Sequence, residues 1–324
     1  LLPVSKLVGV AQFLDGRPSI GAGDLATARQ TATHLASAYA ATPNADAVRA
    51  AAAHADTLTD LLKRARMTEE VKTGLTAAAS DAAALAGYGE RNAGRLDQAD
   101  GWFADALALA RQAGDRGLEA LALAGRAEGL LNRPDSDSAP AVSALEAAAQ
   151  RYRYLPPAAR AWVFGNLALG HAALGDDLAS GRFLEHARAA ASLIRYDGPG
   201  WGWWSTHGEL AGWDGDVRPQ VFTGVRSLWL GRPAGALELF DIALGGTTRP
   251  VRRALLHEDV TNACVALGDP DRACASAHAA LDEAAAHELG RHREEIRGAR
   301  WTFPKEWNRL RPVIELDDRL ALAL

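Results

Sequence analysis

Few residues in this sequence have the types and spacing that chemistry requires. The segment His287-Glu288-Leu289-Gly290-Arg291-His292 combines two histidines with a glutamate, as a zinc-protease helix does. Its histidines are five residues apart, however, whereas two metal ligands on one helical face need a spacing of four. We therefore interpret the segment as a solvated helix end and predict no metal site there.

The remaining nucleophilic and acidic groups do not form a catalytic set. Cys264 and Cys274 are too few for a disulfide framework or a zinc site, so we expect two small buried hydrophobic side chains in a reducing compartment. The carboxylates are spread along the chain, and no glycine-rich phosphate loop follows a strand. The sequence thus predicts a protein without a cofactor, a metal or a catalytic activity.

An unusual concentration of aromatic residues lies between positions 201 and 213. Four indoles, with His207 and Glu209 among them, occur in a chain that is only 6% aromatic: Trp201, Trp203, Trp204 and Trp213. One interpretation is that they fill a gap where regular packing is interrupted. The other is that they form the wall of a binding pocket, since indoles offer a large apolar area with one hydrogen-bond donor each.

The composition favours helices throughout. Alanine and leucine dominate, β-branched residues are sparse, and no segment has the alternation of a strand. The net charge is -5, and the 35 Lys and Arg residues are interleaved with acids, which argues against direct nucleic-acid binding by this chain. No apolar run is long enough to span a membrane and no basic signal sequence is present, so we expect a cytoplasmic protein.

The segment Val221–Leu244 predicts how these helices are arranged. Two amphipathic stretches meet at a turn glycine, with small and large residues at fixed offsets that recur earlier in the chain. The two sets are Gly224, Gly231, Ala236, Phe240, Ala243 and Gly87, Gly94, Ala99, Phe103, Ala106. Small residues allow antiparallel helices to approach closely while the aromatic ring fills the gap one turn further on. The offsets resemble those of the tetratricopeptide repeat (TPR), which implies an all-α superhelix of helical hairpins that binds a ligand.

The same periodicity divides the whole chain. We predict degenerate or capping hairpins over residues 1–67, a TPR-like array over 68–290 and a C-terminal cap over 291–324. Expected helices cover residues 1–14, 24–42, 44–67, 71–92, 118–131, 141–152, 158–174, 178–194, 252–267, 271–289, 291–298 and 313–324, with Asp24 and Thr68 as N-caps.

The concave side of such an array is the expected binding groove. The first helix of each hairpin lines it. Its inward-facing positions are the residue directly after the small residue and the residues one helical turn further along. These positions hold Tyr88, Arg91, Asn92, Trp162, Asn166, Trp229, Glu258 and Asn262. Arginine and asparagine there would hold an extended peptide by its carboxylate or its main-chain amides; the alternative is an ordinary hydrated groove.

A second resemblance is more specific. Several segments are similar to the C-terminal repeat region of actinobacterial helix-turn-helix regulators of the Cro/CI-like class: residues 94–100, 197–201, 209–212, 231–233, 250–254 and 266–269. The resemblance covers the chain from Asp24 onward and implies a sensory or dimerising domain whose DNA-binding domain lies outside these 324 residues. The expected partner is then a peptide, a small molecule, a protein or a second copy of the chain. A free-standing scaffold that joins other proteins is the alternative.

Overall fold

The protein is an all-α superhelix of consecutive helical hairpins. The computed structural model describes residues 19–131, 137–194 and 217–322, and within these ranges the only strand-like feature is an isolated bridge between Ser19 and Arg66. The predicted first helix, at residues 1–14, lies outside them. The α-helices are α2 (Ala22–Ala41), α3 (Ala45–Arg64), α4 (Glu69–Asn92), α5 (Leu96–Ala113), α6 (Arg116–Leu131), α7 (Ala139–Ala149), α8 (Pro157–Ala173), α9 (Asp177–Ala191), α11 (Val217–Trp229), α12 (Pro233–Gly246), α13 (Pro250–Leu267), α14 (Pro270–Ala286), α15 (Gly290–Trp301) and α16 (Arg311–Leu322).

Glycine in the left-handed conformation ends a helix at each tight turn. Gly94, Gly175, Gly231 and Gly268 have φ between +73° and +84° and separate the helices of four hairpins. The N–H group that follows each glycine donates to the carbonyl five residues back, for example from Arg95 to Glu90 at 2.9 Å. This is the Schellman arrangement, which favours glycine because a Cβ atom is strained there. The predicted turns are therefore confirmed.

Helix α5 allows this conformational requirement to be measured. Gly114 has a φ of +69°, Gly101 lies within the helix, and a Cβ atom at either position would meet nothing within 4 Å. We expect Gly114→Ala to destabilise the protein by about 1 kcal/mol, because alanine is strained at positive φ. Gly101→Ala should stabilise it by about 0.5–1 kcal/mol, because alanine loses less entropy in a helix. Urea denaturation measures the free energy of unfolding of both variants. Changes of the same sign in the two variants would contradict the prediction.

Side chains satisfy the amide groups at several helix starts. Asn44 accepts a hydrogen bond from the N–H of Ala47, and Thr68 accepts one from Val71, as predicted for Thr68. The prediction of Asp24 as the cap of α2 was wrong. Gly21 is the cap, and the Asp24 carboxylate in the first turn accepts the Gly21 N–H at 3.0 Å. The sequence pattern placed the N-cap about one turn too late, because an acidic side chain at the third helical position also accepts a hydrogen bond from the helix start.

The predicted pairing of small and large residues is present in two hairpins. A Cβ atom at Gly87 would lie 3.2 Å from the Phe103 ring, and one at Gly224 would lie 2.6 Å from the Phe240 ring. Both phenylalanines are buried, as are the alanines at the equivalent positions: Ala99, Ala106, Ala236 and Ala243. The glycine lets the aromatic ring of the second helix lie directly on the backbone of the first.

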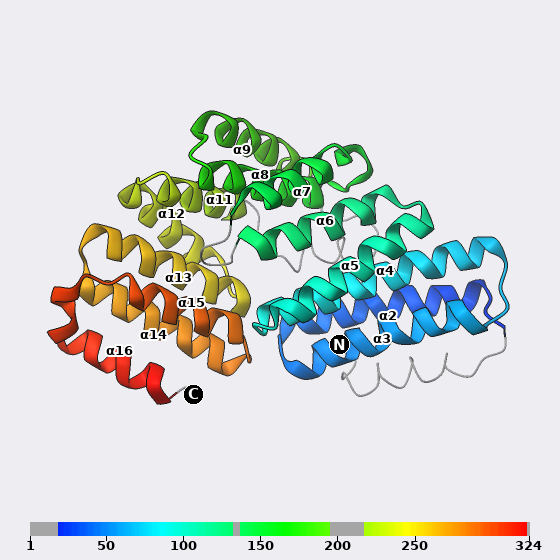
Figure 1. Cartoon of the computed structure of the whole chain (residues 1–324), viewed down its shortest axis with the longest axis horizontal. Helices are drawn as coiled ribbons and strands as arrows, with labels where there is room; N and C mark the ends of the chain where they lie inside the picture. Colours follow the sequence, from blue (N-terminus) through cyan, green and yellow to red (C-terminus); the bar gives the residue numbers. More distant parts are fainter. Residues whose placement is uncertain (1–18, 132–136, 195–216, 323–324) are drawn as a thin grey trace.

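The inner helices of successive hairpins follow one another around an arch. Contacts run from α4 to α6, α8, α11, α13 and α15 in turn, and α15 also contacts α4. Figure 1 shows helices α2–α5 and α13–α16 as the two feet of this arch, with the ends of α4 and α15 close together between them. The described array therefore closes on itself.

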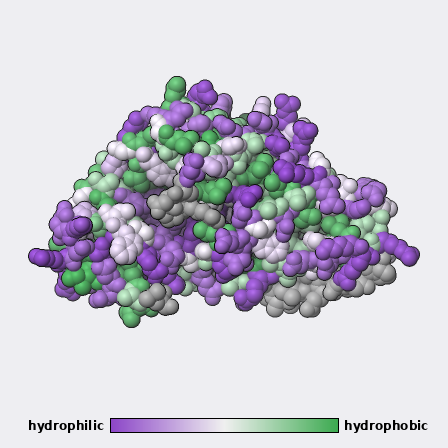
Figure 2. All heavy atoms as spheres, in the orientation of Figure 1, coloured by the Kyte–Doolittle hydropathy of each residue, from purple (hydrophilic) through white to green (hydrophobic). Residues whose placement is uncertain are grey.

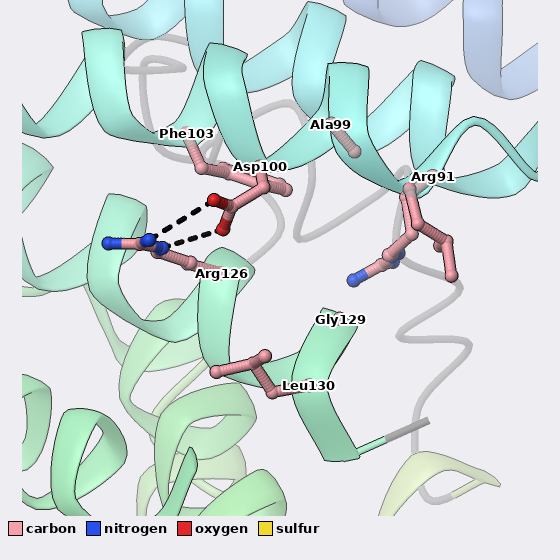
Figure 3. Close-up of a pocket in the computed structure, with 8 residues that line it drawn as sticks. Arg91, Ala99, Asp100, Phe103, Arg126, Gly129 and Leu130 are labelled. Atoms are coloured by element: carbon pink, nitrogen blue, oxygen red, sulfur yellow. Dashed lines mark hydrogen bonds and ion pairs between the residues drawn. The ribbon is translucent and has the colours of Figure 1, made fainter. Parts of the chain in front are cut away.

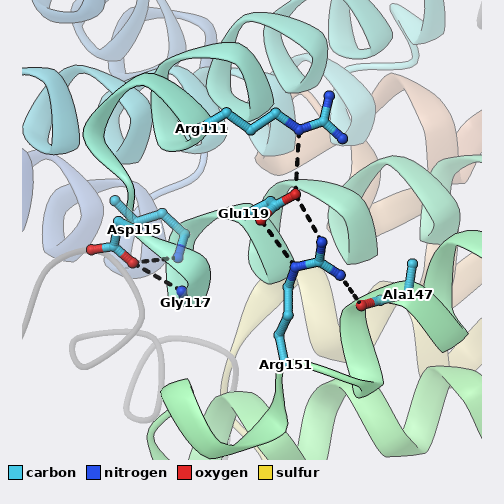
Figure 4. A network of polar contacts seen from close by, with 7 residues as sticks. Arg111, Asp115, Gly117, Glu119, Ala147 and Arg151 are labelled. Atoms are coloured by element: carbon cyan, nitrogen blue, oxygen red, sulfur yellow. Dashed lines mark hydrogen bonds and ion pairs between the residues drawn. The ribbon is translucent and has the colours of Figure 1, made fainter.

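Arginine–carboxylate pairs link neighbouring hairpins. Arg126 of α6 donates to Asp100 of α5 at 2.6 Å, and Arg226 of α11 contacts Asp177 of α9. At one corner Glu119 of α6 accepts from Arg151 at 3.0 Å and from Arg111 at 3.3 Å (Figure 4). Hydrophilic residues also cover much of the face in Figure 2, interspersed with apolar ones. The arginines and acids that alternate in the sequence thus form ion pairs between neighbouring hairpins. Because each of these arginines is paired with an acid, they do not form a basic face.

The last hairpin ends differently from the prediction. Helix α14 ends at Ala286 instead of Leu289, and α15 begins at Gly290, so His287 and His292 lie on opposite sides of a break. Helix α16 buries Val313, Leu316 and Leu320 and packs on α14 as the expected cap of the array. None of the described helices combines the length and the apolar composition needed to cross a membrane.

Candidate functional site

The predicted groove residues lie on inner helices, but most are not on an open surface. Arg91, Asn92, Trp162, Asn166 and Glu258 are buried, Tyr88 is half-buried, and Trp229 and Asn262 are exposed. Six other predicted residues lie outside the described residues: Trp201, Trp203, Trp204, His207, Glu209 and Trp213. Their role in a pocket or in packing stays a prediction.

Three predicted residues, Tyr88, Arg91 and Asn92, meet at the end of α4. Together with Tyr39 and Glu128 they form what we name the α4 cluster. The Arg91 guanidinium donates to Glu128 of α6 at 2.6 Å and lies 4.6 Å from the centre of the Tyr88 ring. The amide of Asn92 donates to the hydroxyl of Tyr39 at 2.9 Å. Burial raises the pKa of Tyr39 well above its usual value. The Arg91 guanidinium and the Asn92 amide thus each have a partner on another helix.

A second set, the α13–α15 cluster, comprises Glu258, Asp259, Arg291, His292 and Glu295. Nδ1 of His292 lies 2.5 Å from Oε1 of Glu258, and His292 is 0% exposed. Burial raises the pKa of Glu258 to about 8 and lowers that of His292. It also raises the pKa values of Asp259 and Glu295. The prediction that His292 belongs to a solvated helix end was wrong, because the break after α14 turns it into the interior.

The closure of the arch brings the two clusters together. A Cβ atom at Gly290 would lie 2.4 Å from the carbonyl oxygen of Ala93, so the turn after α4 contacts the start of α15. The positive charge of Arg91 contributes to lowering the pKa of His292, and that of Arg291 opposes the rise in the pKa of Tyr39. Charged side chains about 200 residues apart in sequence thus share one buried region.

This region has unused hydrogen-bonding capacity. Four buried atoms have no hydrogen-bond partner: Nε of Arg91, Nε of Arg291, Nε2 of His292 and Oδ2 of Asp259. Most buried polar groups in proteins are paired, so each such atom needs an explanation. Two arginine donors and a carboxyl oxygen provide the groups that would bind the carboxylate and amide of a peptide.

A small pocket adjoins the α4 cluster. It lies between α4, α5 and α6 and is lined by Arg91, Leu96, Ala99, Asp100, Phe103, Arg126, Gly129 and Leu130. In Figure 3 the Arg91 side chain extends toward Gly129, while Arg126 and Asp100 pair on the other side. Its volume is about 10 Å³, which is about the space that one water molecule needs. By itself it cannot accept a side chain.

Two other groove predictions have packing contacts. The Trp162 side chain is among the largest that are fully buried and lies in the main hydrophobic cluster. Asn166 donates to the Trp162 carbonyl oxygen one turn earlier, at 3.0 Å. Trp229, at the C-terminal end of α11, is 38% exposed and remains accessible.

Among the described residues, no three His, Cys, Asp or Glu side chains are grouped as metal ligands. Burial raises the pKa of the Cys264 and Cys274 thiols to about 11. Both are therefore thiols near neutral pH and poor nucleophiles.

Sequence reasoning missed Tyr39, Glu128, Asp259, Arg291 and His292. Tyr39 and Glu128 are 53 and 37 residues from their partners, and His292 is 34 residues from Glu258. Asp259 could have been predicted from the sequence, because it directly follows the predicted groove residue Glu258 on the same helix. The others depend on how hairpins stack, which no local spacing reports.

No family model matches the chain, and no curated protein matches it. Among solved structures, it aligns with the TPR domain of P58(IPK) at 13% identity, over 98% of this chain and 97% of that one, with a TM-score of 0.23. A TM-score this low does not identify the fold, which the consecutive helical hairpins themselves establish.

Proposed function

We propose that this chain is a non-catalytic, TPR-like domain that binds a peptide, a small molecule or a protein on its inner face. The observation that carries the proposal is the set of unpartnered polar atoms on inner helices, contributed by Arg91, Asp259, Arg291 and His292. Extended peptides present carboxylate, carbonyl and N–H groups that complement such atoms. The Asp100 and Asp177 carboxylates that pair with arginines between hairpins have a structural role.

We further propose that the domain serves as the sensory or dimerising half of a cytoplasmic transcriptional regulator. The support is the resemblance of residues 94–100 and 231–233, both hairpin turns, to the repeat region of helix-turn-helix regulators. The second candidate is a free-standing scaffold, favoured by the succession of helical hairpins alone. Chromatin immunoprecipitation of the full natural protein separates them: enrichment at discrete promoters supports the regulator, and its absence supports the scaffold.

An exposed inner residue offers a direct test of binding. Asn262 lies on inner helix α13 and is exposed, so its removal leaves no buried group unpaired. Peptides would first be selected against the full chain from a random library and measured by titration calorimetry. We expect Asn262→Ala to weaken binding by about 1 kcal/mol, the value of a typical hydrogen bond.

The matched control is Gln112→Ala on the outer helix α5, where the side chain is also exposed. It should leave the affinity unchanged. Equal effects of the two substitutions, or no selectable peptide, would count against a ligand site on the inner face.

A further inference from the structure

The contact that closes the arch depends on two glycines. A Cβ atom at Gly290 would lie 2.4 Å from the Ala93 carbonyl oxygen, and one at Gly94 would lie 3.1 Å from the Arg291 nitrogen. The distance at Gly290 leaves no room for a side chain, because the neighbouring atom belongs to the backbone. At Gly94 the approach is tight, and the φ of +84° there also favours glycine. We name this contact between residues 93–94 and 290–291 the seam.

Glu288 adds a hydrogen bond beside the seam. Its φ is 54°, and it is the only described residue other than glycine with a positive φ. Its carboxylate accepts the N–H of Ala45 in the first turn of α3, at 2.8 Å. A negative charge is favourable at the positive end of a helix. The backbone strain at Glu288 is thus offset by a contact that exists only while the arch is closed.

Polar groups, rather than a shared apolar core, join the two feet of the arch. Among the described residues, no hydrophobic cluster combines side chains of α2–α5 with side chains of α13–α16. Near the seam lie Arg91, Arg291, Asp259 and His292, each with a buried atom that lacks a partner. Opening the seam would return these groups to water without separating any pair of stacked neighbouring hairpins.

We propose that the seam is a reversible latch, closed when Glu258 and His292 share a proton and released when that proton is lost. Opening separates α4 from α15 and exposes Arg91, Asn92 and Glu258. The latch thereby controls access to the inner face; this consequence, though not the opening itself, rests on the proposed function.

Burial of the pair sets the direction of the response, and the surrounding charges modify it. They come from Arg252 and Asp259 on α13, Arg291 and Glu295 on α15, and Arg91 on α4. Burial raises the pKa of Glu258 from 4.5 to about 8 and that of Asp259 well above 3.8, so the closed form holds protons that the open form releases. Rising pH therefore favours opening.

His292 opposes this response only at lower pH. Its pKa is lowered from 6.5 in the closed form, so the open form gains a proton below pH 6.5. On opening, the proton that His292 gains in this pH range offsets the proton that Glu258 loses. Above about pH 6.5 the offset ends, and each proton released shifts the ratio of open to closed forms by up to about tenfold per pH unit.

The test measures the distance across the seam in the full chain without a ligand. Spin labels are attached at Gln98→Cys and Ala286→Cys, exposed positions on α5 and α14. The native cysteines are buried, and the unsubstituted chain reports their background labelling. Pulsed dipolar spectroscopy at pH 6 should give one short distance, and a longer one should grow as the pH rises to 8.5. Glu258→Gln should weaken this response, because glutamine does not ionise.

Two glycines of α15 provide matched variants. Gly290→Ala should give the long distance at both pH values, because its Cβ atom cannot fit against Ala93. Gly298→Ala places the same methyl group where nothing lies within 4 Å, so it should behave as the parent does. If circular dichroism shows that Gly290→Ala is unfolded, Glu288→Ala replaces it and should also lengthen the distance.

A distance that does not lengthen as the pH rises would overturn the latch, and so would a distance that Gly290→Ala and Glu288→Ala both leave unchanged. Because the measurement needs no ligand, failure of the latch and failure of peptide binding are separate outcomes.

Discussion

Replacing Phe240 by alanine should destabilise the protein by about 3–5 kcal/mol. Its side chain is 0% exposed and lies against Gly224, at the centre of the hairpin formed by α11 and α12. Truncation removes buried apolar area and leaves a cavity, and partial collapse does not recover both losses. Chemical denaturation followed by circular dichroism measures the change in the free energy of unfolding.

The control for Phe240 is Trp301→Ala in α15. Trp301 is larger but 84% exposed, so its removal should change stability by no more than about 0.5 kcal/mol. A loss below about 1 kcal/mol in Phe240→Ala would mean that the ring does not hold the two helices together.

Replacing Glu128 by alanine should also cost about 3–5 kcal/mol, because it removes the carboxylate that pairs with Arg91. Arg91 is only 3% exposed, and its Nη1 lies 2.6 Å from Glu128. A buried charge without its partner is strongly destabilising, even where the intact pair adds little net stability. Thermal unfolding of the variant, compared with the parent at one pH, measures the effect.

Two variants separate charge from hydrogen bonding at this pair. Glu128→Gln keeps an acceptor for Arg91 without the charge and should lose less stability than alanine. Glu185→Ala breaks an exposed pair with Arg188 and should cost no more than about 0.5 kcal/mol. Similar losses for Glu128→Ala and Glu185→Ala would contradict a structural role for the buried pair.

The helical hairpins were predictable because their determinants are local. A glycine after a helix selects the left-handed turn, so Gly94 and Gly231 identified hairpins from sequence alone. The offset from Gly224 to Phe240 gave the packing of the two helices. The predicted end of α14 was wrong by three residues, because helical periodicity continued through His287 and Glu288 while the chain turns there.

Only part of the candidate site followed from the same reasoning. The register placed Tyr88, Arg91 and Asn92 together at the end of α4, where the structure has them. It did not indicate that these side chains are buried or that Tyr39 and Glu128 hold them. Whether any of the predicted groove residues binds a ligand stays a prediction.

The sequence by itself determined the helices, their turns and the contacts within each hairpin, since these depend on residues fewer than about 35 positions apart. The tertiary structure alone decided that the array closes, that Gly290 meets Ala93, and that His292 pairs with Glu258 inside the protein. Closure is the sum of small rotations between successive hairpins. Each rotation depends on how whole helices pack, so no single segment of the chain determines the sum of the rotations.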